Sequence, residues 1–370
     1  MSPIRREDDP VRASIGARAR PAATWLGAAA LAASALSACS DSGGGSAVAP
    51  PPVQARAIKV MVVNMFGGES AGFVSGLGLT QSIPVRGLSP DHPNVLCNAD
   101  DVCQVTTGMG YANAASSISA LLYRSGLDLT RTYFVVAGIA GIDPAQGTLG
   151  SAAWARYVVD WGLAHELDAR EMPAGWQSGY FGIGTRGPGI KPPLDYRTEV
   201  FRLDEALLQR AYALSRNVAL ADSPEAAAFR ANFPAAPANR PPAVIQCDTA
   251  SGDTWWAGTA LGQRARDWVK LMTDGQGTYC TTQQEDNATY EALKRGAAAG
   301  RVDLSRVAVL RSGSDFDRPY PGQSSADALV NYGAQGGFAP ATANLVRAAS
   351  PLIADIVARW NLYRAGVPAN

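Results

Sequence analysis

Short uninterrupted blocks of apolar residues recur along this chain of 370 residues, and most of them end in glycine or a small polar residue. Blocks rich in β-branched and aromatic residues predict strands that are buried on both faces of a sheet. They occupy residues 58–66, 102–110, 131–142, 241–247 and 307–310, and residues 154–170 also have an extended pattern. The last block stops at Leu310, so the sheet is predicted to end before Arg311 and the polar residues that follow it.

Segments with the periodicity of helices lie between these blocks. In residues 113–126, Ala115, Ile118 and Leu122 share one face, and Gly126 is a typical stop. Further helices are predicted at residues 203–217, 222–233, 258–274 and 284–300, followed by two closing helices, the second of which starts at Ser350–Pro351. Residues 67–73 and the Gly- and Pro-rich residues 173–193 are predicted to be loops. Strands that alternate with helices indicate an α/β fold.

The N-terminal segment has the pattern of an export signal. Its basic part contains Arg5, Arg6, Arg12, Arg18 and Arg20, and the apolar stretch after it is short for a membrane span. The stretch ends in "LSAC", residues 36–39, which is typical of a lipobox cleaved before a cysteine that becomes lipidated. We therefore predict a signal peptide at 1–38, lipidation of Cys39, a flexible Gly/Pro-rich tether at 39–55 and one domain at 56–370. An ordinary signal peptide with a chance cysteine is the alternative.

The expected location follows from this segment. A bacterial lipoprotein cysteine carries more than one lipid chain, which is what stable anchoring requires. Ser40, rather than Asp, follows the cysteine and favours the outer membrane. The protein is thus expected to be exported and lipid-anchored, at the periplasmic face of the outer membrane or at the cell surface.

Composition narrows the function further. The formal net charge of zero gives no electrostatic footprint for nucleic acid. Beyond the N-terminal segment, no apolar run approaches the roughly eighteen residues of a spanning helix, which excludes a helical membrane channel. Because the chain has only two histidines, His92 and His165, a zinc site is not expected, and no metal or cofactor is predicted. Neither histidine lies near a nucleophile elbow, which disfavours a Ser-His-Asp triad.

Four cysteines follow Cys39 in the chain. Disulfides persist in exported proteins, and "CNADDVC" forms a compact loop, so a bond between Cys97 and Cys103 is predicted. Cys247 and Cys280 are either a second disulfide or free buried thiols, and the sequence does not decide between these.

Five loops at predicted strand ends carry residues suited to chemistry, and ligands of open α/β sheets bind at the carboxyl ends of strands. They read "FGGES" at 66–70, "TGMG" at 107–110, "AGIAGI" at 137–142, "SGDTWW" at 251–256 and "RSGSD" at 311–315. Each glycine pair taken alone is more often a tight turn. "TGMGYANA" lacks the third glycine of a dinucleotide fingerprint, so a nicotinamide cofactor is not expected.

In chain order, these loops resemble the elements of the nucleoside phosphorylase and nucleosidase superfamily. "TGMG" resembles its (S/T/H)-G-(M/I)-G element, "VVAGIAGI" its strand ending in Ala-Gly-Gly, and "TASGDTWW" its S-G-D-x-F element. "QQEDNA" resembles its M-E-x-x-A segment, and "LRSGSDFD" its R-x-x-S-D element. The whole chain after the N-terminal segment is similar to the purine nucleoside permease family. The resemblance implies a three-layer nucleoside phosphorylase-like α/β fold, with a central mixed β-sheet flanked by helices, that recognises purine nucleosides.

The resemblance places Asp315 where the superfamily's general acid meets the purine, with Ser314 beside it in the substrate site. A protonated carboxyl near purine N7 neutralises the departing base. A free aspartate titrates near pH ~3.9, so this role requires a pKa raised by about three units through burial or a nearby like charge. Asp317 supplies that charge if the strand continues, but its other role is a partner for Arg318 or a turn cap. A turn cap is also the alternative for Asp315.

Further substrate contacts are implied by the same elements. Glu285 matches the glutamate that binds both ribose hydroxyls, for which an acceptor-only carboxylate is suited; a charge on a helix surface is the alternative. Gln284 stands where the superfamily usually has Met beneath the sugar. Trp255 matches the aromatic residue beside the base, although a core Trp is equally ordinary. Gly108 and Gly110 belong to the substrate-binding "TGMG" element.

The nucleophile is the least determined part of the implied site. Phosphorylases of the superfamily have an arginine shortly after the first-strand glycines, and "FGGESAGF" has none. Glu69 stands where the hydrolytic branch has a glutamate that positions water. The competing arrangement is an anion site made of Arg86, in this chain or in a neighbouring subunit, with the backbone N–H groups of Gly108 and Gly110. Ile142 replaces the second glycine of Ala-Gly-Gly.

Together these features predict a protein that binds purine nucleosides and cleaves their N-glycosidic bond, with Asp315 and Glu69 as catalytic residues. Hydrolysis is favoured, and phosphate is a co-substrate only if the reaction is phosphorolysis. A non-catalytic binding component of nucleoside transport is the alternative, and a surface scaffold that has lost the site is a third class. The sequence leaves open the preferred base, a homo-oligomer and a transport partner.

Overall fold

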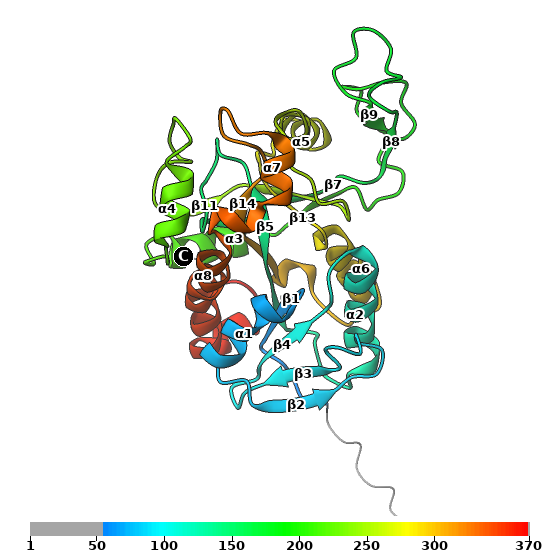
Figure 1. Cartoon of the computed structure of the whole chain (residues 1–370). Helices are drawn as coiled ribbons and strands as arrows, with labels where there is room; N and C mark the ends of the chain where they lie inside the picture. Colours follow the sequence, from blue (N-terminus) through cyan, green and yellow to red (C-terminus); the bar gives the residue numbers. More distant parts are fainter. Residues whose placement is uncertain (1–54, 369–370) are drawn as a thin grey trace, which may run out of the picture. The chain divides into compact units, whose positions relative to one another are not determined.

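The computed structural model describes residues 55–368, and the predictions for the signal peptide, Cys39 and nearly all of the tether lie outside these residues. In the described part of the chain, no helix has both the length and the apolarity needed to cross a membrane. The ordered elements form one compact unit around a central sheet, with helices on both faces (Figure 1).

The central sheet has twelve strands with parallel and antiparallel neighbours. Its main path runs in the order β10 (Val200–Arg202), β7 (Tyr157–Asp160), β12 (Asp248–Ser251), β13 (Tyr279–Gln283), β5 (Tyr133–Ile142), β1 (Val60–Asn64), β4 (Val102–Thr106), β3 (Asn94–Cys97) and β2 (Gln81–Pro84). The strand β14 (Val307–Phe316) pairs in parallel with β5 and antiparallel with β6 (Ala152–Trp154), which also pairs with β11 (Val244–Gln246). A separate pair is formed by β8 (Ala164–Glu166) and β9 (Tyr180–Gly182).

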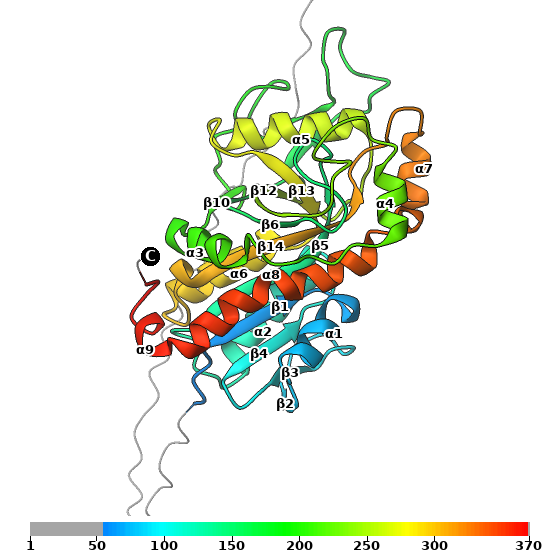
Figure 2. The same ribbon diagram turned by 90° about the vertical axis from the view of Figure 1, so that its left-hand side faces the viewer.

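Helices cover the sheet on both sides. One layer contains α2 (Tyr111–Arg124) and α6 (Asp286–Ala298), and the other contains α1 (Gly67–Gly76), α3 (Glu205–Ser215) and α8 (Phe338–Ala358), as Figures 1 and 2 show. The remaining helices are α4 (Pro224–Arg230), α5 (Thr259–Met272), α7 (Ser325–Val330), α9 (Trp360–Tyr363), and the 3₁₀ turns η1 (Leu304–Arg306) and η2 (Tyr332–Gln335).

The alternation of side chains along β1 explains the two layers. Met61 packs into the core cluster that contains Leu293 of α6, whereas its neighbour Val62 packs into the cluster that contains Phe73 of α1 and Leu352 of α8. Successive side chains of a strand point to opposite faces, so a continuous apolar strand requires a helical layer on each side. The predicted three-layer arrangement, with a mixed sheet between helices, is confirmed.

The last central strand is longer than predicted. The sheet was expected to end at Leu310, but β14 runs on to Phe316, and all of its residues are buried. The prediction was wrong because Arg311, Ser314 and Asp315 are polar, and a polar run inside a strand reads as a loop. The extended strand carries these side chains into the core, where they have polar partners.

Two helical predictions also need correction. Residues 67–73 were expected to be a loop but belong to α1, where burial of Phe73 and acceptance of the Met65 N–H by Glu69 hold a glycine-rich turn. The helix expected to begin at Ser350–Pro351 is the second half of α8, which contains Pro351. A proline inside a helix costs about 3 kcal/mol. The buried apolar face of α8 on both sides of Pro351 offsets that cost.

Both cysteine pairs form disulfides. The predicted bond joins Cys97 and Cys103 across the antiparallel pair β3–β4. The pair that the sequence left open, Cys247 and Cys280, is also bonded, and it links the residue before β12 to the neighbouring strand β13.

The two disulfides should differ in their contribution to stability. They close loops with sequence separations of 6 and 33 residues. In the loop-entropy model these cross-links contribute about 2 and about 4 kcal/mol. We expect the double variant Cys247→Ala/Cys280→Ala to lower the urea midpoint of unfolding more than Cys97→Ala/Cys103→Ala does. Equal midpoints for the two double variants would contradict this order.

Candidate functional site

A pocket lies where the carboxyl ends of several strands meet, as expected for an open α/β sheet. Its volume, including the open mouth, is about 550 Å³. Its walls come from the residues that follow β1 and β12, from the ends of β13, β5 and β14, and from α1. The lining residues with side-chain polar groups suited to chemistry are Glu69, Gln283, Gln284, Glu285, Arg311, Ser314 and Asp315.

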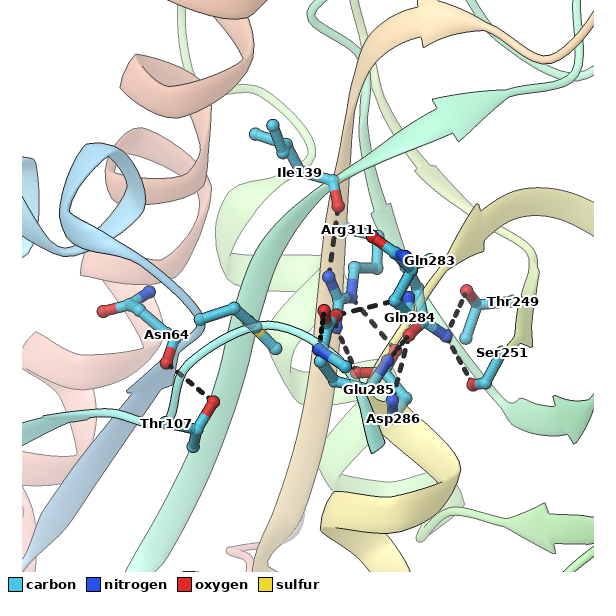
Figure 3. A network of polar contacts seen from close by, with 12 residues as sticks. Asn64, Thr107, Ile139, Thr249, Ser251, Gln283, Gln284, Glu285, Asp286 and Arg311 are labelled. Carbon is cyan, nitrogen blue, oxygen red and sulfur yellow. Dashed lines mark hydrogen bonds and ion pairs between the residues drawn. The ribbon is translucent and has the colours of Figure 1, made fainter. Parts of the chain in front are cut away.

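Arg311 is the centre of the polar network in this pocket (Figure 3). Its Nε donates to Asp286 Oδ2 at 3.0 Å, its Nη2 donates to Asp286 Oδ1 and to Glu285 Oε2, the latter at 3.3 Å, and its Nη1 donates to the carbonyl of Ile139 at 3.1 Å. Burial alone would lower the pKa of Arg311, but Asp286 and Glu285 outweigh this effect and raise that pKa above its usual range. The guanidinium therefore joins β14 to β5 and to the start of α6.

Glu69 faces the same centre from the first turn of α1. Its Oε2 accepts the N–H of Met65 and its Oε1 accepts the N–H of Ile139, both at 2.7 Å. Burial raises the pKa of Glu69 to about 7, although Arg311 and the two backbone donors lower it. A carboxylate has about four acceptor positions, so both oxygens can still accept a hydrogen bond from the pocket.

Gly138 keeps Glu69 and Arg311 close to β5. A Cβ atom at this position would lie 2.9 Å from Glu69 Oε1 and would collide with Arg311 Nη1. Gly138 in "VVAGIAGI" is therefore required for close packing, because the side chains of Glu69 and Arg311 occupy the space that a side chain at this position would fill.

Glu285 is positioned from two sides. It precedes α6, it is 4% exposed, and its Oε1 accepts the N–H of Gly110 at 3.1 Å while its Oε2 faces Arg311. Burial raises the pKa of Glu285, and Arg311 counteracts this effect. Gly108 and Gly110 both have φ near +86°, which favours glycine. The turn that they form delivers the Gly110 N–H to Glu285, while Met109, between them, lines the pocket.

Asp315 lines the same pocket from β14 and is 3% exposed. Burial is the largest effect on Asp315 and raises its pKa to about 6, and the charge of Asp317 also raises it. Two hydrogen bonds lower this pKa, one from the Ser314 hydroxyl, which donates to Asp315 Oδ1 at 2.7 Å, and one from Trp255. Asp317 has both roles that the sequence suggested, because it also accepts from Arg318 Nε at 2.7 Å.

Trp255 and Gln284 lie toward the mouth. Trp255 is 44% exposed, so it is not a core tryptophan, and its ring centroid is 4.4 Å from that of Tyr332. Gln284 Nε2 donates to the carbonyl of Asp253 at 2.5 Å. The next residue, Trp256, also lines the pocket and stacks on Trp161 with ring centroids 4.9 Å apart. An exposed ring beside a buried carboxyl suits stacking against a planar ligand.

Arg86 lies apart from these residues. It is exposed in the turn between β2 and β3 and does not line the pocket of its own chain. The alternative in which it reaches the pocket of a neighbouring subunit stays a prediction. Among residues 55–368, no cluster of histidine, cysteine, aspartate and glutamate is arranged to hold a metal ion.

Sequence reasoning missed Arg311 and Asp286 as site residues. Both belong to the segments "QQEDNA" and "LRSGSDFD" that carried the resemblance, but neither was assigned a role. A signal was present, because an arginine directly after a buried apolar block needs an acid partner. What the sequence could not show is that α6 begins beside β14.

A buried, carboxylate-rich pocket at the strand ends of a three-layer α/β sheet is typical of proteins that bind a small polar ligand. A sequence model of the family "Purine nucleoside permease (NUP)" matches residues 57–368. The chain belongs to the purine nucleoside permease family, as its motifs predicted.

Two relatives illustrate this membership. A probable purine nucleoside permease of Schizosaccharomyces pombe is 40% identical over 318 residues, which cover 82% of this chain and 90% of the relative. A purine nucleoside permease of Candida albicans is 39% identical over 314 residues, which cover 83% of this chain and 77% of the relative.

Solved structures with a similar arrangement are more distant. Futalosine hydrolase of Helicobacter pylori has a TM-score of 0.48 and 11% identity, with 79% of this chain and 97% of that chain covered. A 5′-methylthioadenosine/S-adenosylhomocysteine nucleosidase of Neisseria meningitidis has a TM-score of 0.46 and 13% identity, with 80% and 99% covered.

The raised pKa of Asp315 should make the protein less stable at high pH. An unfolded aspartate has a pKa of about 3.9, so between that value and about 6 the folded state binds more protons. The stability contribution of this carboxyl is complete below about pH 4 and is lost as the pH rises through 6, a loss of about 3 kcal/mol. Asp315→Asn should therefore raise the free energy of unfolding at pH 8 by up to this amount, and have little effect near pH 4.

Urea unfolding of the wild type and Asp315→Asn at pH 4 and pH 8 measures this difference. Asp100→Asn, at an exposed carboxylate, is the matched control and should show no such pH-dependent gain. If Asp315→Asn lowered the free energy of unfolding at both pH values, the raised pKa of Asp315 would be contradicted.

Proposed function

We propose that this protein binds a purine nucleoside in the pocket and hydrolyses its N-glycosidic bond. Membership of the purine nucleoside permease family supports the substrate class. The observation that carries the reaction is the pair of buried carboxyl groups, Asp315 and Glu69, that line one pocket with pKa values raised to about 6 and about 7. Groups that titrate near neutral pH can donate and accept protons in a reaction at that pH.

Asp315 is the general acid in this proposal. The purine stacks near Trp255, which is exposed at the mouth and close enough to Asp315 to influence its pKa. A purine that covers the pocket removes further water from the carboxyl, which favours its protonated form. The protonated carboxyl then gives its proton to N7 as the base departs.

Glu285 is the ribose ligand. Its carboxylate is fixed by the Gly110 N–H and by Arg311, so its orientation is set before a ligand arrives. Two adjacent hydroxyls of a ribose are donors, and an ionised carboxylate can accept from both. Arg311 favours the ionised form of Glu285 against the effect of burial.

The charge of the pocket favours water over phosphate as the nucleophile. Within the described residues, the lining includes the three acids Glu69, Glu285 and Asp315, and Arg311 is its one cation. The donors of Arg311 are already directed at Asp286, Glu285 and the carbonyl of Ile139. The Gly110 N–H is occupied by Glu285. A phosphate dianion needs cationic or several N–H donors, and carboxylates repel it.

The proposed step balances as a hydrolysis. Glu69 accepts a proton from a water molecule whose oxygen forms a bond to C1′ of the ribose. The C1′–N9 bond breaks, its electron pair goes to the purine, and Asp315 protonates N7. The products are free ribose and the purine base, and exchange with solvent returns Asp315 and Glu69 to their starting forms.

A binding component of nucleoside transport is the second candidate, and the names of the relatives, which are permeases, favour it. Such a protein would use Glu285, Asp315 and Trp255 for recognition without turnover. The two candidates differ only in whether the bound nucleoside is cleaved.

Turnover of inosine should proceed without phosphate and yield free ribose. Active molecules have Glu69 ionised and Asp315 protonated, so kcat/KM should follow a bell-shaped pH profile with a maximum near 6.5, midway between about 6 and about 7. Asp315→Asn should remove turnover but keep inosine binding. Ribose 1-phosphate formed only with added phosphate would overturn the role of Glu69, and binding without cleavage would favour the transport component.

Glu285→Gln should separate recognition of the sugar from recognition of the base. The amide keeps one accepting oxygen but presents a donor to the second hydroxyl, so inosine binding should weaken at least tenfold, in the range that loss of a charged hydrogen bond implies. Hypoxanthine, which has no ribose, should bind within about twofold of the wild type. Calorimetry with both ligands measures this, with Glu291→Gln, inside α6, as a control. Equal losses for the two ligands would remove the ribose assignment.

A further inference from the structure

A second feature of the molecule lies outside the proposed nucleoside site. Arg264, in α5, is 8% exposed, and its guanidinium lies between two aromatic rings, 3.7 Å from the centroid of Trp161 and 3.6 Å from that of Tyr180. The ring of Trp268, one helical turn further along α5, is 5.6 Å away. Three aromatic rings therefore pack around the guanidinium of Arg264.

No hydrogen-bond partner for these donors exists in residues 55–368. The nitrogens Nε, Nη1 and Nη2 of Arg264 are all buried and without an acceptor. Burial is the largest effect on Arg264 and lowers its pKa to about 9, although Tyr180 and Glu166 raise it. Glu166 Oε1 accepts from the Tyr180 hydroxyl at 2.8 Å.

Arg264 differs in this respect from the other buried arginines of the described chain. Arg230 pairs with Asp222, Arg306 with Asp303, Arg311 with Asp286, and Arg318 with Asp317. A buried charge without a counterion costs several kcal/mol, and a cation–π contact returns about 2 kcal/mol. The guanidinium of Arg264 therefore has the electrostatic character of a site that lacks its anion.

This side chain lines a separate, larger pocket. The pocket has a volume of about 1460 Å³, including its open mouth, and shares no lining residue with the first. One wall is α5, and the other is the segment at residues 175–190 around β9; Figures 1 and 2 show this segment and α5 at the same end of the molecule. Its donors and rings are Arg264, Arg186, Gln177, Ser178, Gln263, Trp176, Tyr180 and Trp268, and Asp267 is its one acid among the described residues.

We propose that this second pocket binds a small organic oxyanion, a carboxylate or a phosphate ester, with Arg264 as its charged ligand. An oxyanion offers in-plane acceptors to the N–H donors of a guanidinium that have no partner, which is the geometry that arginine prefers. Arg186 adds a second positive charge from the opposite wall. The aromatic rings supply a surface for the apolar part of the ligand.

The site is independent of the nucleoside reaction, but it changes how a phosphate effect on that reaction is interpreted. Phosphate bound beside Arg264 would alter the protein without entering the product. An effect of phosphate on turnover that yields only free ribose is thus assigned to the second pocket, and formation of ribose 1-phosphate is assigned to the first.

Calorimetric titration of the purified protein at constant ionic strength tests the proposal, with sodium phosphate, sodium acetate and choline chloride as probes. We expect an anion to bind with one site per chain and choline not to bind, and the stronger of the two anions identifies the ligand chemistry. Arg264→Met should weaken the anion at least tenfold, and Arg186→Gln should weaken it about threefold. Arg301→Gln removes an exposed charge outside both pockets and should have no effect.

Further variants separate this site from a structural role and from the first pocket. Arg264→Lys keeps the charge and should restore part of the affinity lost in Arg264→Met. Asp315→Asn should leave anion affinity unchanged, whereas a gain in affinity would place the anion in the first pocket and overturn the proposal. It is also overturned if the wild type binds neither anion, or if Arg264→Met binds like the wild type. If Arg264→Met does not fold, Arg186→Gln decides, and unchanged affinity in that variant overturns the site.

Discussion

The pocket depends on one buried cation. Arg311 is fully buried, and its guanidinium links the middle of β14 to β5 and to the start of α6. The start of α6 brings Glu285 and Asp286, and β5 brings the carbonyl of Ile139, groups that would be unfavourable alone in the interior. Removal of one partner of a buried ion pair costs about 3–5 kcal/mol, because the other charge is left without compensation. The arrangement is therefore all or none, and a ligand meets a site whose polar groups are already in place.

The same cation divides the acids of the pocket into two environments. Burial raises the pKa values of Glu285 and Glu69, and the positive charge of Arg311 lowers both. Asp315 lies beyond its main influence and has the negative charge of Asp317 nearby instead. Burial is nevertheless the largest effect on both Asp315 and Glu69, and it raises their pKa values to about 6 and about 7. One strand, β14, carries Arg311 and Asp315 only four residues apart, so the geometry of a single strand sets both environments.

Sequence alone predicted the layers of the fold and named six of the residues that line the first pocket, for reasons that the structure makes plain. Apolar blocks such as residues 58–66 alternate between two helical layers, and this pattern is local. The motifs around Asp315, Glu285, Glu69 and Trp255 converge because strand ends share one edge of a sheet. The errors arose where long-range contacts override local preference. Arg311 is accommodated in β14 because it pairs with Asp286, and Pro351 is accommodated in α8 because the apolar face of that helix is buried. The second pocket had no sequence signal, since its character comes from rings that surround Arg264 in space.

The stack of Trp161 on Trp256 has a consequence for how this protein absorbs light. The two indoles lie nearly parallel, with an interplanar angle of 14° and centroids 4.9 Å apart, so their electronic transitions couple. Coupled indoles add paired bands of opposite sign to the far-ultraviolet circular dichroism spectrum, in the region where helices are usually quantified. These bands, where resolved, report whether Trp256 in the wall of the first pocket keeps its native stacking on Trp161.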